Sequence, residues 1–217
     1  MTELLAVLIA YLLGSLPFGY WVPRLVRGED IRTKGSGNVG ASNVLRVYGR
    51  SLGISVALLD VAKGFAAASL GLWAGGALVG VLAGAAAMIG HARPVFMRFQ
   101  RGGKMVATAG GATFALAPLA AFVCIGVWLV VFLMTRFASL ASIVTAGMLA
   151  VLVVALGYEW PIAAFGVAGA VAVIALHHAN IRRLFAGTEH RFELRPPRRV
   201  QGRAGPDAAT RPRSGHL

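Results

Sequence analysis

The sequence predicts an all-α integral membrane protein, a polytopic bundle of about seven transmembrane helices. Hydrophobic residues make up 57% of the 217 residues and charged residues only 13%, and the mean hydropathy is +0.72. Such a chain is too apolar to face water on all sides. Its apolar residues form long uninterrupted runs, and its lysines and arginines gather in the polar segments between those runs. This pattern is typical of membrane-spanning helices.

The first half of the chain contains three predicted spans, at residues 3–26, 52–73 and 75–90, with Pro17 inside the first. No basic region precedes the first run and no small-residue cleavage site follows it, so we do not expect a removed signal peptide. In the third span, Gly76, Gly80 and Gly84 recur at four-residue spacing. This spacing predicts close packing against a neighbouring helix.

The apolar run at residues 105–134 decides the topology. A single helix of that length would extend roughly 45 Å, well beyond a hydrocarbon core of about 30 Å. Pro118, which follows Ala117, predicts a break that divides the run into a short helix and a second, longer one. The short helix at residues 105–117 is not long enough to cross a membrane comfortably. Two further spans follow at residues 138–156 and 160–176.

The placement of positive charge predicts the orientation. Of the 21 lysines and arginines, Lys63 alone lies inside a span, and the others fall at residues 24–50, 93–104, 136 and 182–213. If the long run is split at Pro118, all of these polar segments lie on one side of the membrane. Without the split, Arg136 and the basic C-terminal segment would face outward. The positive-inside rule therefore favours seven segments, with the N-terminus outside and the C-terminus in the cytoplasm.

The first cytoplasmic loop is rich in glycine, amide and hydroxyl groups and ends in Arg46. Such a flexible, donor-rich loop suits phosphate or carbonyl oxygens, and a guanidinium can bind phosphate bidentately. Its G-x-G-x-x-G pattern does not predict a dinucleotide fold, because no βαβ unit surrounds it. A simple turn before a capped helix remains the alternative. The candidate binding residues of this loop are Gly35, Ser36, Gly37, Asn38, Gly40, Asn43 and Arg46.

The second candidate segment, residues 101–108, contains Gly102, Gly103 and Lys104. Adjacent glycines let the backbone turn its amides toward one point, and the lysine adds a compact positive charge. The segment leads into an apolar, helical stretch whose N-terminus adds partial positive charge. These features favour a phosphate site, which would extend to Thr108. The alternative is a solvated loop whose lysine only follows the positive-inside rule.

The third segment runs from His177 to Glu189. If the last helix continues past residue 176, His177 and Asn180 share one face. An interfacial histidine of this kind often only forms a local hydrogen bond. No carboxylate or further histidine stands at metal-ligand spacing, so we expect no metal site. His91 is a weaker candidate, for positioning the second loop.

Asp60 and Lys63 lie three residues apart within the second predicted span. The simplest interpretation is mutual neutralisation, because an unpaired charge in lipid is costly. A proton or ion pathway is the alternative, and it would make the protein a small transporter of a phosphorylated metabolite. The single cysteine, Cys124, lies in an apolar run and is expected to pack there.

Several motifs, in this order, resemble the bacterial acyl-phosphate:glycerol-3-phosphate acyltransferases of the PlsY type. They are GSLPFG at residues 14–19, GSGNVGASN at 35–43 with Arg46, LDVAKG at 59–64, GHARPVF at 90–96, the GGK loop with VAT at 106–108, and the segment from Asn180 to Glu189. The resemblance covers nearly the whole chain. It implies a seven-helix membrane protein of the bacterial inner (cytoplasmic) membrane, with its active site on the cytoplasmic face.

The resemblance also implies the reaction. The 1-hydroxyl of glycerol 3-phosphate would attack the carbonyl of an acyl phosphate and give 1-acylglycerol 3-phosphate for phospholipid synthesis. The partners would be these two substrates and membrane lipid, without a cofactor or nucleic acid, and the oligomeric state is left open. Gly102 and Gly103 would hold phosphate, and Glu189 would be structural. The residues implied in catalysis are Ser36, Arg46, Lys104, His177 and Asn180.

Three departures from the family pattern stand out. Met105 replaces the glycine that usually follows the GGK sequence, and a left-handed backbone there would cost on the order of 1 to 2 kcal/mol. The third motif has Leu176, His178 and Ala179 where charged residues are usual, and Ser42 replaces a threonine. An inactive paralogue is therefore a further alternative.

The chain divides into a membrane acyltransferase domain at residues 1–194 and a C-terminal tail at residues 195–217. The tail is rich in proline, glycine and arginine and has little apolar content. This composition predicts a disordered cytoplasmic segment. Its positive charge suits anionic lipid headgroups, although a merely soluble tail is equally consistent with it.

Overall fold

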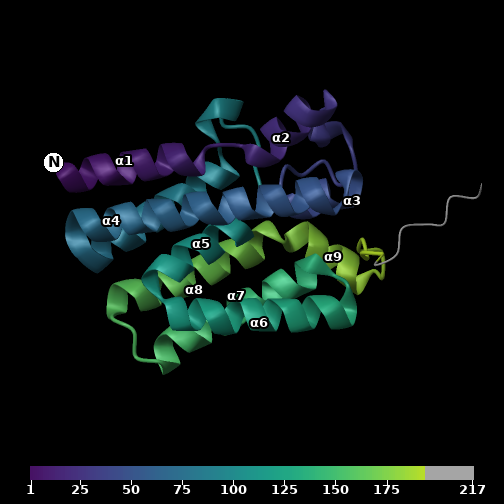
Figure 1. The fold of residues 1–217 in the computed structure, drawn as a ribbon. Helices are drawn as coiled ribbons and strands as arrows, with labels where there is room; N and C mark the ends of the chain where they lie inside the picture. Colours follow the sequence, from purple (N-terminus) through teal and green to yellow (C-terminus); the bar gives the residue numbers. More distant parts are fainter. Residues whose placement is uncertain (194–217) are drawn as a thin grey trace, which may run out of the picture.

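The structure, a computed structural model, describes residues 1–193. The predicted tail at residues 195–217 lies outside the described residues. All regular elements of the described part are helices, in agreement with the predicted class. Figure 1 shows the longest helices running side by side, with α5 (Val106–Leu116) between α4 (Arg50–Ala92) and α8 (Trp160–Leu176). The short helices α2 (Phe18–Arg27), α3 (Ala41–Tyr48) and α9 (His178–Phe185) gather at the end opposite the N-terminus.

The predicted first span, residues 3–26, is not one helix. It consists of α1 (Thr2–Gly14) and α2 (Phe18–Arg27), which are separated at residues 15–17. Pro17 interrupts the helix because proline has no backbone N–H to donate. Lys63 compensates for part of the break, since its Nζ donates to the carbonyl oxygen of Leu16 at 2.8 Å. This hydrogen bond joins the first span to the middle of the second.

The second and third predicted spans form one continuous element, α4 (Arg50–Ala92), which turns at Gly75 and Gly76. Gly76 has a φ of 71°, a left-handed conformation that favours glycine. A Cβ on Gly71 would lie 2.7 Å from the Cβ of Ala83. Twelve residues of straight helix would separate these positions by roughly 18 Å, so α4 is a helical hairpin. The prediction of two packed spans is confirmed. The predicted glycine face is confirmed for Gly80 and Gly84, which lie close to neighbouring helices, but it is wrong for Gly76, because that residue forms the turn and a Cβ there would meet nothing within 4 Å.

The break predicted at Pro118 is also confirmed. α5 (Val106–Leu116) ends just before it, and Pro118 is the first residue of α6 (Pro118–Thr135). The remaining helices are α7 (Ala138–Ala155), α8 (Trp160–Leu176) and α9 (His178–Phe185), and two short 3₁₀ turns lie at Ile31–Thr33 and Val95–Met97. α3 (Ala41–Tyr48) follows the first loop.

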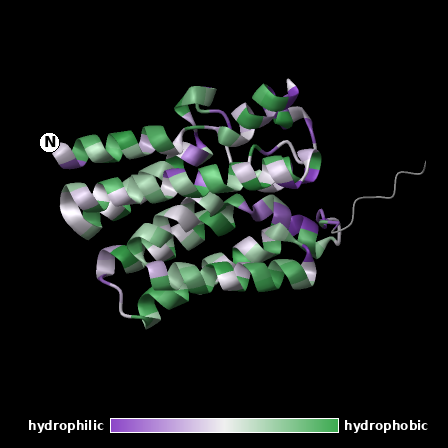
Figure 2. Cartoon of the chain, in the orientation of Figure 1, coloured by the Kyte–Doolittle hydropathy of each residue, from purple (hydrophilic) through white to green (hydrophobic). Residues whose placement is uncertain are grey.

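The exterior of the bundle is apolar along the long helices. Figure 2 shows hydrophobic residues over most of their length and hydrophilic residues concentrated at the end that carries α9 and in the loops. By length and composition, four helical stretches of the described residues could cross a membrane, or five when the bent pair α8 and α9 counts as one span. α4 alone would extend roughly 64 Å if straight, about twice a hydrocarbon core, as two passes require.

Asp60 and Lys63 form a buried ion pair inside α4. Lys63 Nζ lies 2.8 Å from Asp60 Oδ1, and the two side chains are only 3% and 2% exposed. His91 Nδ1, from the returning arm of the same hairpin, lies 3.5 Å from the same carboxylate oxygen. The expected neutralisation of this pair is confirmed. The cluster also connects both arms of α4 with the break between α1 and α2.

Candidate active site

Three segments far apart in the sequence meet at the end of the bundle that carries α2, α3 and α9. Lys104 Nζ, before α5, donates a hydrogen bond to Asn180 Oδ1 on α9 at 2.6 Å. Asn38 Nδ2, in the first loop, donates to the carbonyl oxygen of Gly102 at 3.3 Å. The structure therefore brings the three predicted segments together at one end of the bundle.

Asn43 organises the first loop from within. Its amide nitrogen donates to the carbonyl oxygens of Lys34 at 3.0 Å and Asn38 at 2.9 Å, and its Oδ1 accepts the backbone N–H of Ser36 at 2.9 Å. Gly35 has a φ of 57°, and a Cβ there would overlap the Asn43 amide. With Asn43 only 2% exposed, these contacts hold the loop in one shape and leave the Ser36 side chain exposed.

The glycines of the second loop allow close packing against His91. The amide of Gly102 donates to the carbonyl oxygen of Ala92 at 2.9 Å, and the amide of Gly103 donates to that of His91 at 3.1 Å. A Cβ on Gly103 would overlap the His91 imidazole, and one on Gly102 would overlap the His91 carbonyl. These two amides thus already have acceptors within the loop, and the glycines place the following lysine.

Lys104 is partly buried beside the N-terminus of α5. The hydrogen bond from Ala109 N to Met105 O opens this helix, so the amides of residues 106–108 precede its first helical bond. Burial lowers the pKa of Lys104 to about 8, and the positive charges of Arg183, Arg101 and Arg46 act in the same direction, whereas Glu189 opposes them. The site thus combines an ammonium group with a helix N-terminus, an arrangement that favours anions.

Met105 has a left-handed backbone, with a φ of 69°. The glycine that is usual at this position in the family had suggested such a conformation. The Met105 side chain is 9% exposed and packs in the main apolar core. Replacing Met105 with alanine removes this packing and keeps the strain, whereas glycine also relieves the strain. We expect both variants to be less stable than the wild type, and Met105→Gly to be more stable than Met105→Ala by about 1 kcal/mol. Thermal unfolding of the three proteins in one detergent measures the difference, and a glycine variant no more stable than the alanine variant would contradict it.

His177 occupies the junction between α8 and α9, which are bent by 59°. The helix does not continue straight past Leu176, so the face shared by His177 and Asn180 is made by the bend. His177 Nδ1 lies 2.7 Å from the carbonyl oxygen of Val173, and a carbonyl only accepts, so Nδ1 carries the proton and Nε2 has the free lone pair. Burial lowers the pKa of His177 to about 4. The imidazole is therefore neutral at physiological pH.

Glu189 holds the third segment in place. Its carboxylate accepts hydrogen bonds from Ser139 Oγ at 2.8 Å, Asn180 Nδ2 at 2.7 Å and Arg183 Nε at 2.7 Å. Burial acts to raise the pKa of this carboxyl, but the three hydrogen bonds outweigh burial and the pKa is lowered. Because Asn180 donates to Glu189 with one end of its amide, the other end is oriented to accept from Lys104. The sequence did not indicate Ser139, which stands in an apolar run, and it assigned no role to Arg183 within the third segment.

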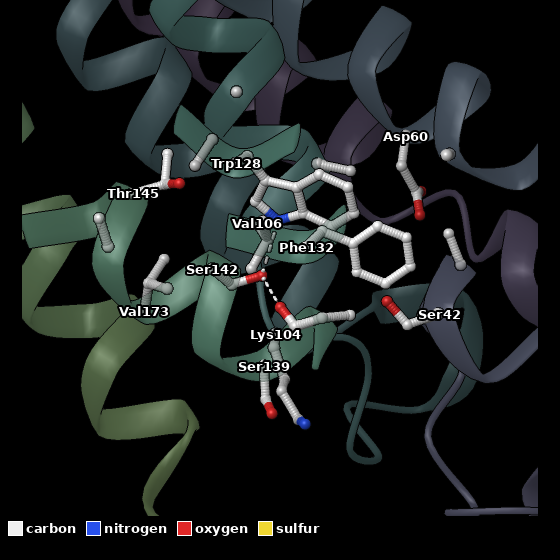
Figure 3. A pocket seen from close by; sticks show the side chains of 18 of the residues that line it. Ser42, Asp60, Lys104, Val106, Trp128, Phe132, Ser139, Ser142, Thr145 and Val173 are labelled. Carbon is white, nitrogen blue, oxygen red and sulfur yellow. Dashed lines mark hydrogen bonds between the residues drawn. The ribbon is translucent and has the colours of Figure 1, made fainter. Parts of the chain in front are cut away.

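A cavity of about 640 Å³ extends from these polar residues into the bundle. Figure 3 shows Lys104 and Ser139 at one end, and the rings of Trp128 and Phe132 beside the polar row of Ser142 and Thr145 on α7. Trp128 Nε1 donates to Ser142 Oγ at 3.2 Å. The rest of the wall is mostly apolar and comes from α3 to α8. The cavity is thus polar at one end and apolar along its length.

The cavity separates the predicted site residues into two groups. Those that line it are Ser36, Asn38, Gly40, Asn43, Arg46, Lys104, His177 and Asn180. The lining does not include Gly35, Gly37, Gly102, Gly103 or Thr108. Thr108 is fully buried, and its backbone packs against Gly64 of α4. The residues of the second group lie outside the cavity lining and contribute to the packing around the site.

Comparisons with known proteins agree with this geometry. A family model described as "Glycerol-3-phosphate acyltransferase" matches residues 4–187. A protein named glycerol-3-phosphate acyltransferase from Synechococcus sp. is 47% identical over 88% of this chain and 96% of its own length. One named glycerol-3-phosphate acyltransferase 2 from Moorella thermoacetica is 46% identical over 87% of this chain and 97% of its own. The crystal structure of PlsY, an integral membrane glycerol 3-phosphate acyltransferase, in its glycerol 3-phosphate form superposes with a TM-score of 0.85, at 40% identity, over 89% of this chain and 96% of that one.

Proposed function

The chain belongs to the glycerol-3-phosphate acyltransferase family, and from this premise we propose that it takes its acyl group from an acyl phosphate and transfers it to the 1-hydroxyl of glycerol 3-phosphate. The protein is a multi-pass membrane acyltransferase of phospholipid synthesis that acts on glycerol 3-phosphate. The proposal concerns the donor, the hydroxyl group, the residues that act, and the side of the membrane on which they lie.

One observation carries the proposal: two cations face the cavity without a carboxylate partner. Among residues 1–193, no carboxylate forms an ion pair with Arg46 or Lys104. The partner of Lys104 is the neutral amide of Asn180, and Glu189 forms its ion pair with Arg183 instead. Partly buried cations require a counter-charge, and phosphate groups supply it with several acceptor oxygens.

An acyl phosphate fits this charge distribution better than an acyl thioester. It places a phosphate next to the reacting carbonyl, so the cations that bind it also stabilise negative charge that develops on the transferred group. A thioester has no charge at that position. The acyl chain itself would extend along the apolar wall past Trp128 and Phe132. Glycerol 3-phosphate would bind at the polar end, where Ser36 offers an exposed hydroxyl.

In the reaction, the 1-hydroxyl oxygen forms a bond to the acyl carbonyl carbon, and the bond from that carbon to the phosphate oxygen breaks. Inorganic phosphate leaves with the electron pair. Lys104 and Arg46 hold the two phosphate groups and neutralise developing charge, while Asn180 orients Lys104. A phosphate oxygen, with a pKa near 6, is the better acceptor for the hydroxyl proton, because the lowered pKa of His177 makes it a weaker base. His177 then contributes a hydrogen bond through Nε2.

We further propose seven membrane segments, with the N-terminus outside and the site on the cytoplasmic face of a bacterial inner membrane. Two observations support this arrangement. The start of α5 at Lys104 and the loop after α6 at Arg136 lie at one end of the bundle. Lys104 donates to Asn180 on α9, and Phe192, which follows α9, donates its N–H to Arg136 O at 2.9 Å. The basic loops also gather there, as the positive-inside rule requires of a cytoplasmic end.

Purified protein in lipid tests the donor directly. With labelled glycerol 3-phosphate, we expect a lyso product with an acyl phosphate and none with the matching acyl-CoA. In intact membrane vesicles, inverted vesicles should react with added glycerol 3-phosphate, and right-side-out vesicles should react only after permeabilisation. Counterflow of labelled substrate without product would support the transporter alternative, and the absence of turnover with every acyl phosphate would exclude the proposal.

A further inference from the structure

Arg46 presents an unusual set of contacts for a group expected to hold phosphate. Its Nε is buried without a hydrogen-bond partner among the described residues. Its guanidinium carbon lies 4.7 Å from the centroid of the Phe192 ring. Nothing else in the described hydrogen bonds or ion pairs fixes this side chain, so an aromatic face is the feature that orients its charge.

Phe192 is itself held firmly. It is 9% exposed, its N–H donates to Arg136 O at 2.9 Å, and its ring packs edge-on against Phe132 at 5.4 Å between centroids. Phe132 in turn stacks on Trp128 at 5.0 Å. An aromatic row on α6 therefore continues into Phe192 and ends at the Arg46 guanidinium.

The segment that carries Phe192 crosses the polar end of the cavity. Glu189 fastens it to α7 and α9 through Ser139 and Asn180. Both Glu189 and Phe192 line the cavity. The family match ends at residue 187, so Phe192 lies beyond the residues that the family model covers.

We propose that Phe192 is a positioning residue, which holds the Arg46 guanidinium over the polar end of the cavity and pre-orients it for phosphate. The inference rests on the proposed function of Arg46. A cation above an aromatic face gains about 1 to 2 kcal/mol in partly desolvated sites. A side chain ordered in advance also loses less freedom when its ligand binds.

The test compares variants of Phe192 in the full-length protein in lipid. Phe192→Leu keeps apolar bulk and removes the aromatic face, whereas Phe192→Trp keeps a face. We expect Phe192→Leu to raise the KM for one of the two phosphorylated substrates about 5- to 30-fold with kcat changed less than about threefold. Phe192→Trp should stay within about twofold of the wild type. Phe185→Leu, which removes an exposed ring on α9, should behave as the wild type.

Arg46→Lys supplies the second arm, because an ammonium keeps the charge but loses the planar stacking surface, so it depends less on the ring. In that background, Phe192→Leu should raise the KM by less than it does in the wild type. The inference would be overturned by a KM for Phe192→Leu equal to that of the wild type, by equal losses in Phe192→Leu and Phe192→Trp, or by a loss in the Arg46→Lys background as large as in the wild type. Should Phe192→Leu not fold, Phe192→Met carries the same comparison. Loss of the proposed function is distinct, since the wild type itself would then show no acyl transfer.

Discussion

Replacing Lys104 with methionine is expected to lower kcat/KM for acyl transfer about 100- to 1,000-fold, the usual effect of removing one preorganised charged donor. Methionine keeps the length of the side chain and removes its charge. The change leaves the Asn180 oxygen, which lies 2.6 Å from Lys104 Nζ, without its donor. Of the cations in the cavity lining, Arg46 then remains without a carboxylate partner among the described residues, whereas Arg183 pairs with Glu189. Steady-state kinetics with both substrates varied measures the loss.

The pH dependence provides an independent readout of the same lysine. Its pKa is lowered to about 8, so the ammonium is present below that pH and is lost above it. For the free enzyme, kcat/KM should therefore fall as pH rises through about 8. In Lys104→Arg, this alkaline fall should disappear, because the guanidinium stays protonated. An alkaline limb that persists in Lys104→Arg would assign the titration to another group.

Lys34 supplies the matched control for the methionine substitution. It pairs with Glu29 at 2.7 Å on the surface and does not line the cavity. Lys34→Met should leave kcat/KM within about twofold, because exposed ion pairs contribute little. Equal losses in Lys34→Met and Lys104→Met would show that net charge, and not a contact in the cavity, controls the rate.

Replacing Asp60 with asparagine is expected to lower the free energy of unfolding by about 3–5 kcal/mol, because it leaves the buried Lys63 ammonium without its counter-charge. The double variant Asp60→Asn with Lys63→Met should recover most of the loss, since no charge is then left unpaired. Thermal unfolding of both singles and the double in one detergent gives the coupling. If the double is as unstable as the sum of the singles, the pair does not act by neutralisation.

The same series also tests the idea that Asp60 and Lys63 form an ion pathway. Under the structural interpretation, the folded double variant keeps glycerol 3-phosphate acylation. A pathway would require both charges, so the double variant would fold but fail. Glu29→Gln, which breaks an exposed pair, is the control for a change of net charge alone and should leave the stability nearly unchanged.

The sequence predicted those features that depend on local composition. Apolar runs and glycines located the α4 hairpin, and Pro118 located the break between α5 and α6, because proline acts on its own helix. Pro17 marks the break between α1 and α2 in the same way, yet residues 3–26 were predicted as one span. The lysine that satisfies the Leu16 carbonyl stands 47 residues away, and this contact could not be predicted from the local sequence.

In the candidate site too, some features follow from the local sequence and others depend on distant contacts. Ser36, Arg46, Lys104, His177 and Asn180 stand in polar motifs, and all five line the cavity. The reason for Gly102 and Gly103 could not be read from their own motif, because it depends on the carbonyl and the imidazole of His91. The prediction that His91 positions the second loop agrees with these contacts.

Two further contacts of the site were equally hidden in the sequence. Ser139 lies in an apolar span, and only the tertiary fold brings it to Glu189. Phe192 stands in a basic segment without apolar periodicity, where nothing marks it as part of a row of rings on α6. Long-range pairings of this kind require the fold itself.

The cavity wall also reaches the outer surface of the bundle. Ile54, Ile125, Leu129 and Leu133 line the cavity and are each 47% to 61% exposed on the apolar exterior. Under the proposed reaction, a newly made molecule with a charged headgroup and one hydrocarbon tail would border the surrounding leaflet on its tail side from the moment it forms. It would exit laterally by partitioning, and no stage of its departure would expose the tail to water, at a cost of about 0.8 kcal/mol for each methylene group.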